Sequence, residues 1–448
     1  MIRADARSLV ACIGIGLGAS MFVQCVQVLG VERAEVLQLS DASTSEGGST
    51  CGEGKSSCGG ATCSIDLRTD PTNCGECGLR CAANNATATC QNGTCGLSCK
   101  PGFADCDTLA TNACEVELAG NQNHCGKCGR SCGGGACTAG LCEPVRLSQS
   151  SADVRGFGVK GQELAVLAGW TLTKQAFATG DGVVVSAPPT TFVASFAFDS
   201  ADLLFARQNQ QDLRQVALFR SAGGAETCLV GETRLQAYAA NATDVYLAVG
   251  NVPNGLNIVS LPRGTSACVG DGTLTSLPSP FFSLAGDTRG HAFVVDGDLV
   301  YFAVGGVASS AGIYRIRTSA GQVDAVVTTA QIPLDPGATS LFADQTHLYW
   351  RSSSGLRRAT KLTSCATEAL CTEVFASDAL GTALALDATS VYLAVRDVRR
   401  GFGVSARRKT DGTEVAFVPT PAAATALFVD DTWLAWSVGS AVYRTVKP

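Results

Sequence analysis

The C-terminal two thirds of the chain contain a short apolar segment that recurs seven times. The seven segments are residues 164–166, 203–205, 245–247, 300–302, 348–350, 391–393 and 434–436, and their centres lie 39, 42, 55, 48, 43 and 43 residues apart. A repeat of this length, with about four strands per unit, is the sequence signature of a β-propeller. We therefore expect an all-β fold with seven blades over residues 146–448, or six blades if the first repeat is irregular.

The recurring segments carry consecutive apolar residues rather than an alternation of apolar and polar ones. A strand of this kind is buried on both faces, as expected in a blade packed between two neighbours. After the last segment there is room for only one more strand, around residues 442–446, so the last blade is one strand short. Residues 145–148 would supply the missing strand and close the ring without a free edge.

An acidic or amide residue stands five positions before the centre of six of the seven segments. These residues are Asp199, Asn241, Asp296, Asp344, Asp387 and Asp430. A ring of carboxylates would suit a cation, but Asp and Asn at a turn between strands more often accept local backbone hydrogen bonds. We therefore expect this position to have a role in the turn.

Sixteen of the 22 cysteines lie within residues 51–142 and form two copies of an eight-cysteine unit. In both copies the third to sixth cysteines are separated by ten, two and three residues. The first copy contains Cys51, Cys58, Cys63, Cys74, Cys77, Cys81, Cys90 and Cys95, and the second contains Cys99, Cys106, Cys114, Cys125, Cys128, Cys132, Cys137 and Cys142. This pattern indicates two tandem modules, module 1 over residues 51–98 and module 2 over residues 99–145.

The cysteines of such small modules have three chemical interpretations. In an exported chain an even number at regular spacing indicates disulfides, because the modules have too little apolar surface to fold alone. A zinc site would need reduced thiolates, and a redox pair would need a strand and a helix around it, so we favour disulfides. The pairing within each module stays open at this stage.

The remaining cysteines of the propeller region suggest two further bridges. Cys365 and Cys371 are six residues apart across an expected hairpin and would form a local disulfide. Cys228 and Cys268 follow their segment centres by 24 and 22 residues, which would place them on comparable strands of adjacent blades. A bridge between these two requires their Cα atoms to approach within about 7 Å.

The N-terminus has the pattern of an export signal. Arg3 and Arg7 precede a run without charge from Ser8 to Val31. Such a run is a cleaved signal peptide or, if retained, a membrane anchor, and a lipoprotein-like Leu-Val-Ala-Cys sequence ends at Cys12. We assign residues 1–30 to this segment and residues 31–50 to a flexible Ser, Thr and Gly linker. The bulk of the chain would then be periplasmic, at the cell surface or extracellular, and only this segment would touch a membrane.

Two resemblances accompany these patterns. Residues 70–81 read Asp-Pro-Thr-Asn-Cys-Gly-Glu-Cys-Gly-Leu-Arg-Cys, and residues 91–95 read Gln-Asn-Gly-Thr-Cys. This text resembles the cysteine-rich domain of the stigma-specific protein family, which implies a secreted module without a defined activity. The family's frequent double cysteine is absent, so its pairing is not carried over. Residues 348–351 and 355–362 resemble single blades of YWTD-type and related propellers.

The sequence offers no readable catalytic site or cofactor. Its three histidines, at positions 124, 291 and 347, have no metal-binding spacing, and neither a Gly-x-Ser-x-Gly nor a phosphate-binding motif is present. The net charge of −6 argues against a nucleic-acid partner. A basic cluster in the fifth and sixth repeats would suit an anionic ligand if its loops share one face. Its members are Arg351, Arg396, Arg399 and Arg400.

These observations favour a non-enzymatic binding protein. In this hypothesis disulfide-linked modules act as a stalk that presents a propeller, and the partner is an unidentified protein or glycan. The alternative is a propeller hydrolase or lyase with a metal site over the central channel. The sequence predicts neither the ligand nor the oligomeric state.

Overall fold

The computed structural model describes most of the chain after residue 50. The described ranges are 51–59, 63–109, 112–177, 182–186, 191–198, 202–212, 214–222, 225–251, 255–265, 267–270, 282–285, 288–306, 312–318, 322–328, 341–352, 355–361, 372–376 and 383–448. All helical or strand structure in these ranges is β-strand, as expected. No helix in them is long and apolar enough to cross a membrane.

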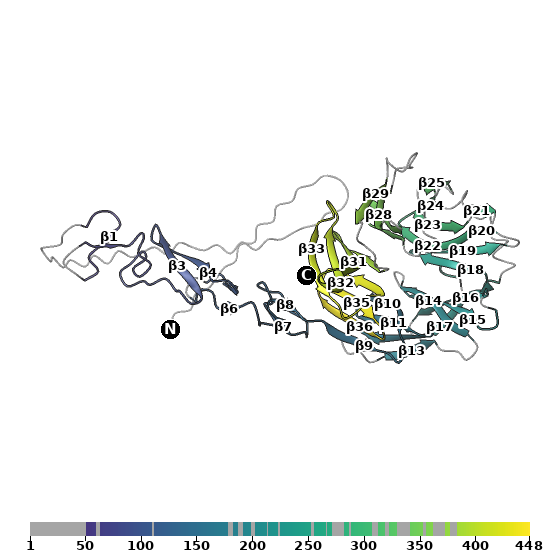
Figure 1. The fold of residues 1–448 in the computed structure, drawn as a ribbon, viewed down its shortest axis with the longest axis horizontal. Coiled ribbons are helices and arrows are strands. Elements are labelled where there is room, and N and C mark those ends of the chain that lie inside the picture. The colour runs from purple at the N-terminus through teal and green to yellow at the C-terminus, as the bar shows by residue number, and fades with distance from the viewer. Residues whose placement is uncertain are drawn as a thin grey trace, which may run out of the picture.

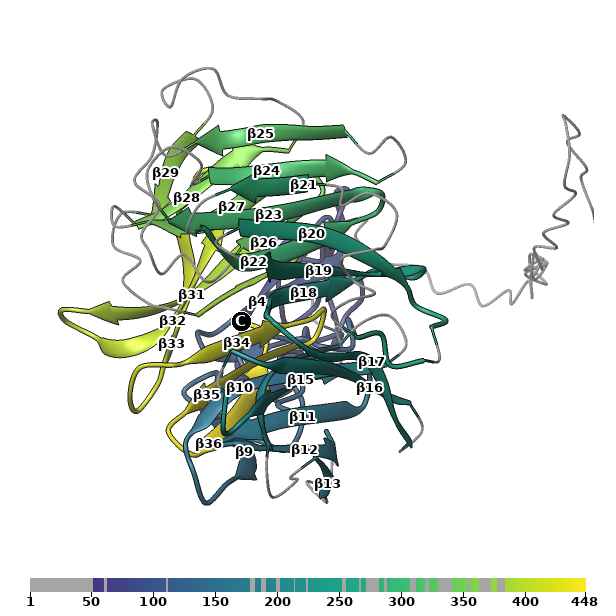
Figure 2. The ribbon, with the colours of Figure 1, turned by 90° about the vertical axis from the view of Figure 1, so that its right-hand side faces the viewer.

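Seven four-stranded antiparallel sheets in the described residues form the blades of a propeller (Figure 2). Each of the first six blades takes four consecutive strands. Blade 1 contains β10 (Val154–Lys160), β11 (Glu163–Ala168), β12 (Thr171–Ala176) and β13 (Gly182–Ser186); blade 2 contains β14 (Thr191–Phe198), β15 (Leu203–Asn209), β16 (Val216–Ala222) and β17 (Ala225–Thr233); blade 3 contains β18 (Leu235–Ala240), β19 (Asp244–Asn251), β20 (Gly255–Pro262) and β21 (Phe282–Ala285).

The second half of the ring follows the same order. Blade 4 contains β22 (Thr288–Asp296), β23 (Leu299–Gly306), β24 (Gly312–Arg317) and β25 (Gln322–Thr328); blade 5 contains β26 (Leu341–Ala343), β27 (His347–Ser352), β28 (Gly355–Thr360) and β29 (Thr372–Ala376); blade 6 contains β30 (Leu384–Leu386), β31 (Ser390–Asp397), β32 (Gly401–Arg408) and β33 (Glu414–Pro419).

Blade 7 joins the two ends of the propeller. It combines β34 (Ala426–Val429), β35 (Trp433–Val438) and β36 (Ala441–Val446) with β9 (Val145–Gln149), which precedes blade 1 in the sequence. β9 pairs with β36 in antiparallel register, with Arg146 opposite Tyr443. The first strand of this blade, β34, also contacts β10 of blade 1. The predicted closing strand is therefore confirmed, and it completes the four strands of blade 7.

The core lies between the blades. The predicted apolar segments fall on the second strand of each blade, and β31 is buried at six consecutive positions. Neighbouring blades share clusters of these side chains; Tyr301 of blade 4 packs in one cluster with Trp350 of blade 5. At the join, Val166 of blade 1 shares a cluster with Ala435 of blade 7. Each large side chain buried in this way contributes roughly 1.5–3 kcal/mol to folding.

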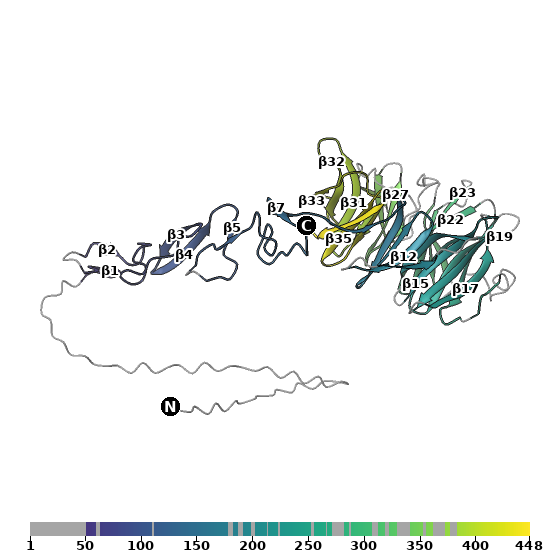
Figure 3. The ribbon, with the colours of Figure 1, turned by 90° about the horizontal axis from the view of Figure 1, so that it is seen from below.

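The cysteine-rich modules are short hairpins held by disulfides, and they lie to one side of the propeller (Figures 1 and 3). Their strands pair in the order β1 with β2, β3 with β4, β5 with β6 and β7 with β8. The strands are β1 (Lys55–Ser56), β2 (Ile65–Asp66), β3 (Ala86–Gln91), β4 (Thr94–Cys99), β5 (Phe103–Ala104), β6 (Val116–Glu117), β7 (Cys137–Thr138) and β8 (Leu141–Cys142).

Both modules use one disulfide pattern, in which the cysteines pair first with third, second with fifth, fourth with seventh and sixth with eighth. The bridges of module 1 are Cys51–Cys63, Cys58–Cys77, Cys74–Cys90 and Cys81–Cys95. Those of module 2 are Cys99–Cys114, Cys106–Cys128, Cys125–Cys137 and Cys132–Cys142. Each module therefore closes on itself, and zinc coordination by these sulfurs is ruled out because they are oxidised.

Two cysteine expectations concern the propeller. Cys228 and Cys268 form a disulfide, but they do not lie on comparable strands. Cys228 lies on β17 at the outer edge of blade 2, whereas Cys268 follows β20, outside the named strands of blade 3. The connection after β20 returns beside blade 2, where Val269 bridges Val230. Cys365 and Cys371 lie outside the described residues.

Module 2 contacts blade 7 directly. The backbone at Gly133 lies against the indole of Trp433, so that a Cβ there would come 2.0 Å from the ring. Arg444 stacks between Trp433 and Phe177, with its guanidinium carbon 4.2 and 4.8 Å from the two ring centroids. Arg444 also donates to the Gly133 carbonyl at 3.4 Å, and Thr445 donates to the Cys142 carbonyl at 3.1 Å. The modules thus join the propeller through packed contacts as well as through the chain.

Candidate functional site

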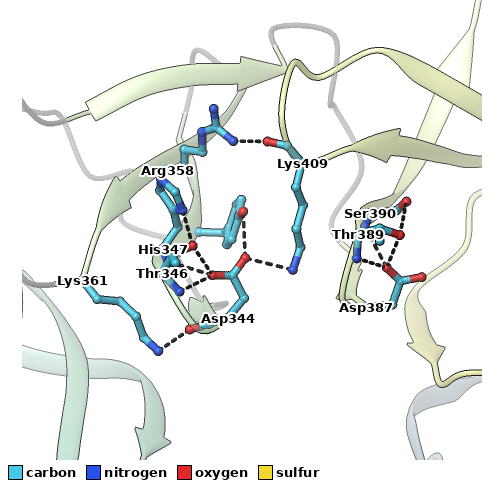
Figure 4. A network of polar contacts seen from close by, with 10 residues as sticks. Asp344, Thr346, His347, Arg358, Lys361, Asp387, Thr389, Ser390 and Lys409 are labelled. Atoms are coloured by element: carbon cyan, nitrogen blue, oxygen red, sulfur yellow. Dashed lines mark hydrogen bonds and ion pairs between the residues drawn. The ribbon is translucent and has the colours of Figure 1, made fainter.

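A cavity of about 760 Å³ opens where three successive blades bring together the turns between their first and second strands. The turns belong to blades 5, 6 and 7, and the residue after β32 completes the wall. The charged and titratable lining residues are Asp344, His347, Tyr349, Arg358, Asp387, Lys409, Asp430 and Asp431. Figure 4 shows the polar network at blades 5 and 6. A concave surface with so many convergent polar groups is the strongest candidate site in the described residues.

Each of the three turns is built by its aspartate. Oδ1 of Asp344 accepts backbone hydrogen bonds from Thr346 and His347 at 2.8 and 2.7 Å. Asp387 and Asp430 accept the equivalent pairs of bonds in blades 6 and 7. The predicted turn role of the recurring acid is confirmed at these positions, because the side chain replaces backbone partners that the strands do not supply.

The second carboxylate oxygen in blades 5 and 6 binds a lysine from the next blade. Nζ of Lys409 in blade 6 lies 2.8 Å from Oδ2 of Asp344 in blade 5. Nζ of Lys447 in blade 7 lies 3.0 Å from Oδ2 of Asp387 in blade 6. Lys361 of blade 5 pairs with Asp296 of blade 4 in the same manner. We call each such pair an interblade clasp.

A tyrosine on the second strand completes the clasps of blades 5 and 6. The hydroxyl of Tyr349 donates to Oδ2 of Asp344 at 3.0 Å, and that of Tyr392 donates to Oδ2 of Asp387 at 2.9 Å. Burial, together with the adjacent Asp344, raises the pKa of Tyr349 to about 12. The phenol therefore keeps its proton at neutral pH and remains a hydrogen-bond donor.

The clasps fix the charges of the cavity. Burial alone would raise the pKa of Asp387, but hydrogen bonds from Lys447 and the turn N–H groups outweigh it and lower the pKa to about 2. The same balance, with Lys409 as the lysine, holds the pKa of Asp344 well below its ordinary value. Burial, then the nearby charge of Arg358, lowers the pKa of His347. At neutral pH the site thus presents fixed carboxylates beside a neutral imidazole, an arrangement suited to holding a polar or charged ligand.

The sequence-predicted arginines lie at the opposite ends of the second strands. Arg396 is the last residue but one of β31, Arg399 and Arg400 lie in the turn to β32, and Arg351 is near the end of β27. Turns that join second to third strands share one end of the blades, so the backbone places all four on the face away from the cavity. Arg396, Arg399 and Arg400 are all exposed, and Arg400 is also held by Asp397 at 3.0 Å and Glu414 at 2.5 Å.

Metal-like clusters occur elsewhere in the described residues. Three of them consist wholly or mainly of cysteines that are already paired in disulfides. The fourth brings together Asp105, Asp107 and Glu115 in module 2. Asp105 and Asp107 accept backbone hydrogen bonds from Thr108 and Leu109 at 2.7 and 2.9 Å, which is the behaviour of a turn.

Sequence reasoning missed the clasp lysines. Lys361, Lys409 and Lys447 each stand immediately after the third strand of a blade. A spacing in the sequence does mark these lysines, because each follows the turn aspartate of its own blade by 17 or 22 residues. The aspartate that each lysine binds, however, belongs to the preceding blade.

Comparisons with known proteins give distant structural matches of low sequence identity. No protein-family model matches the chain, and no curated protein matches it. The computationally designed Ika8 protein is 14% identical, with a TM-score of 0.45 over 67% of this chain and 98% of that one. BamB from Moraxella catarrhalis is 11% identical, with a TM-score of 0.41 over 68% and 99% of the two chains. The gluconolactonase XC5397 from Xanthomonas campestris is 15% identical, with a TM-score of 0.40 over 68% and 89%.

Proposed function

We propose that this chain is an exported, non-enzymatic binding protein in which the two disulfide-linked modules present a β-propeller to a protein or glycan partner. The disulfides support an oxidising, exported environment. Within the proposal, residues 1–30 direct export or anchor the chain, and the protein acts in the periplasm, at the cell surface or outside the cell. The cavity at blades 5 to 7 is the recognition site.

The observation that carries this proposal is the preorganised wall of the cavity. Asp344 and Asp387 are each fixed by a lysine, a tyrosine and two backbone N–H groups, so neither carboxylate moves or changes protonation at neutral pH. A carboxylate with so low a pKa is a weak general base and does not serve as a general acid. Its acceptor positions are already filled by two backbone N–H groups, a tyrosine hydroxyl and a lysine, so the clasps support the proposal by holding the cavity wall in a fixed concave shape that favours binding.

The test uses a matched pair of turn variants in the full chain. Ala388 lines the cavity in the turn after Asp387, and Ala242 occupies the same place after Asn241 in blade 3. Ligands are first selected with glycan arrays and with proteins of the source's extracellular fraction. We expect Ala388→Trp to fill the cavity and weaken binding at least tenfold, whereas Ala242→Trp leaves it unchanged. Equal binding by both variants would remove the cavity as the site, and a stoichiometric divalent ion in the purified protein would favour the hydrolase or lyase alternative.

A further inference from the structure

One backbone position recurs after the third strand of the described blades. Its N–H donates to a carbonyl in the turn between the first and second strands of its own blade. In blades 3 to 6 the residues at this position are Arg263, Thr318, Lys361 and Lys409, with donor–acceptor distances of 2.8–2.9 Å. Lys447 of blade 7 and Phe177 of blade 1 make the same bond, at 2.8 and 2.7 Å. The six residues are therefore structurally equivalent, and we call this position the clasp position.

The side chain at the clasp position matches the turn of the preceding blade. Lysines occupy it wherever that turn carries Asp296, Asp344 or Asp387. In blade 4 the residue is the uncharged Thr318, and the turn that it faces, in blade 3, carries the uncharged Asn241. Where the clasp position lacks a cation, the turn that it faces therefore lacks an acid. This is expected, because a half-buried carboxylate without a partner lowers the stability of the fold.

Blade 7 departs from this rule. Its turn retains the acid, Asp430, but the clasp position of the next blade holds Phe177, which is buried against Trp433 and Arg444. The clasp tyrosine is also missing, because Ala435 occupies its place on β35. Oδ1 of Asp430 accepts the two turn N–H groups, and Oδ2 has no hydrogen-bond or ion-pair partner in the described part of the chain. This carboxylate lines the cavity next to Asp431.

We propose that Asp430 binds the ammonium group of a lysine side chain from a protein partner, which takes the place of the missing clasp lysine. The inference rests on the proposed function, in that it assumes the cavity at blades 5 to 7 to be a recognition site. Three clasps in this molecule show that a lysine reaches the equivalent carboxylate, with two of the distances at 2.8 and 3.0 Å. Asp431 adds a second negative charge at the site, while Lys409 and Arg358 across the cavity would repel a cation that sits elsewhere in it.

The chain itself supplies a conservative variant for the test. Asn241 builds the same turn as Asp430 and accepts backbone hydrogen bonds from Thr243 and Asp244 at 2.9 and 2.8 Å. Asp430→Asn should therefore keep the fold and remove only the charge. Asp153→Asn, at an exposed position on the other face, is the matched control for the loss of one acid. Unchanged melting temperatures of both variants would establish that the turn is intact.

The probe is the peptide Gly-Gly-Lys-Gly-Gly, with blocked ends, titrated into the full chain at low salt by calorimetry. Its partner probe carries an acetylated Nε, which keeps the length and removes the charge. We expect the free-amine peptide to bind, and expect either Asp430→Asn or lysine acetylation to weaken binding at least fivefold. Asp153→Asn should bind like the parent chain. Glucosamine, with N-acetylglucosamine as its control, tests whether an amino sugar is preferred.

The outcomes separate this inference from the proposed function. Binding of the free-amine peptide that is unaffected by Asp430→Asn would overturn the assignment of Asp430. Charge-dependent binding of glucosamine without binding of the peptide would overturn the lysine partner. If Ala388→Trp abolishes capture of a selected ligand but no ammonium probe binds, the cavity remains the recognition site and the inference fails. If Ala388→Trp does not weaken binding of any selected ligand, the cavity is not the recognition site, and the proposed function of the cavity is excluded before the inference about Asp430 is reached.

Discussion

Nζ of Lys409 lies 2.8 Å from Oδ2 of Asp344, so a side chain of blade 6 closes the turn that begins the second strand of blade 5. Both side chains are largely buried, with 12% and 14% of their surface exposed. Because the two residues belong to different sheets, the bond fixes the position of one blade relative to the next. The carbonyl of Lys409 also accepts a hydrogen bond from Arg358 of blade 5, which adds a second link across the same boundary.

Replacing the lysine of this clasp should destabilise the propeller. Lys409→Met leaves the largely buried Asp344 without its cation, so we expect the free energy of unfolding in urea to fall by about 2 kcal/mol. Asp344→Asn should lower the free energy of unfolding by less than Lys409→Met, because Asn241 forms the same turn in blade 3. A double-mutant cycle should show a coupling of about 1 kcal/mol between the two residues.

A surface ion pair provides the comparison for that cycle. Lys174 lies 2.9 Å from Glu163 within blade 1, but 24% and 53% of the two side chains are exposed. We expect Lys174→Met to change stability by less than about 1 kcal/mol. Equal losses for the two lysine variants would contradict a role for the clasp between blades.

The clasps also predict sensitivity to acid. The pKa of Asp387 falls from 3.8 to about 2 in the folded chain, and that of Asp344 is lowered further. Between those values the unfolded chain binds more protons than the folded one, so stability is full above about pH 4 and is lost as the pH falls toward 2. After solvent screening each carboxylate should account for about 1 kcal/mol. Thermal melts between pH 5 and pH 2 should show a melting temperature that declines as the pH falls, and the decline should be shallower in the double variant Lys409→Met/Lys447→Met than in the parent chain. Declines of equal steepness in the two proteins would exclude the clasps as the cause.

The sequence was sufficient for features set by local contacts. The aspartate turns could be predicted because Asp387 bonds to backbone groups two and three residues away. The blades could be predicted because burial on both faces leaves uninterrupted apolar segments, such as the one in β31. The closing strand β9 followed from the shortfall of one strand in the last blade. All of these features leave a signal within a few residues or within one repeat.

Features that join distant residues could not be predicted in the same way. Lys409 is 65 positions from Asp344, and only the stacking of blades brings them together. The disulfide pattern was likewise open, because eight cysteines permit many pairings and only the folded backbone selects one. The prediction that Cys268 lies on a strand comparable to that of Cys228 was wrong because it assumed a uniform repeat. Cys268 lies instead in the connection after β20. Departures from the repeat were therefore the least predictable features, and Asp430 is one of them.

Contact between module 2 and blade 7 should depend on a glycine. Gly133 has a φ of +57°, and an added Cβ would come 2.0 Å from the Trp433 ring. We expect Gly133→Ala to separate module 2 from blade 7, with faster hydrogen exchange in β36 and cleavage by proteases near residues 142–145. Gly129→Ala is the control, because Gly129 also has a positive φ, +73°, but open space around it. Similar exchange in both variants would show that backbone strain, not the contact with Trp433, is responsible.

The arginines of the other face should divide into two groups. Arg400 bonds to Asp397 and Glu414 and stacks on Phe417 at 3.9 Å, so its charge is already neutralised. Arg396 and Arg399 are exposed beside Val398, which is fully exposed at the tip of the hairpin. If this tip binds acidic polysaccharides, Arg396→Ser/Arg399→Ser should weaken binding of heparin at least threefold at low salt and leave the melting temperature unchanged.

In the same assays, Arg400→Ser should mainly lower stability and should affect heparin binding less. Removal of its guanidinium leaves Asp397 without its cation, removes one of the two cations near Glu414 and exposes Phe417, so we expect a loss of stability of about 1 kcal/mol. Heparin binding should weaken less than in the double variant, because Arg400 has little charge to offer a ligand. Heparin affinity that is unchanged in the double variant would remove this face as an anion site, and a greater loss of affinity in Arg400→Ser would show that the ligand displaces its two carboxylates.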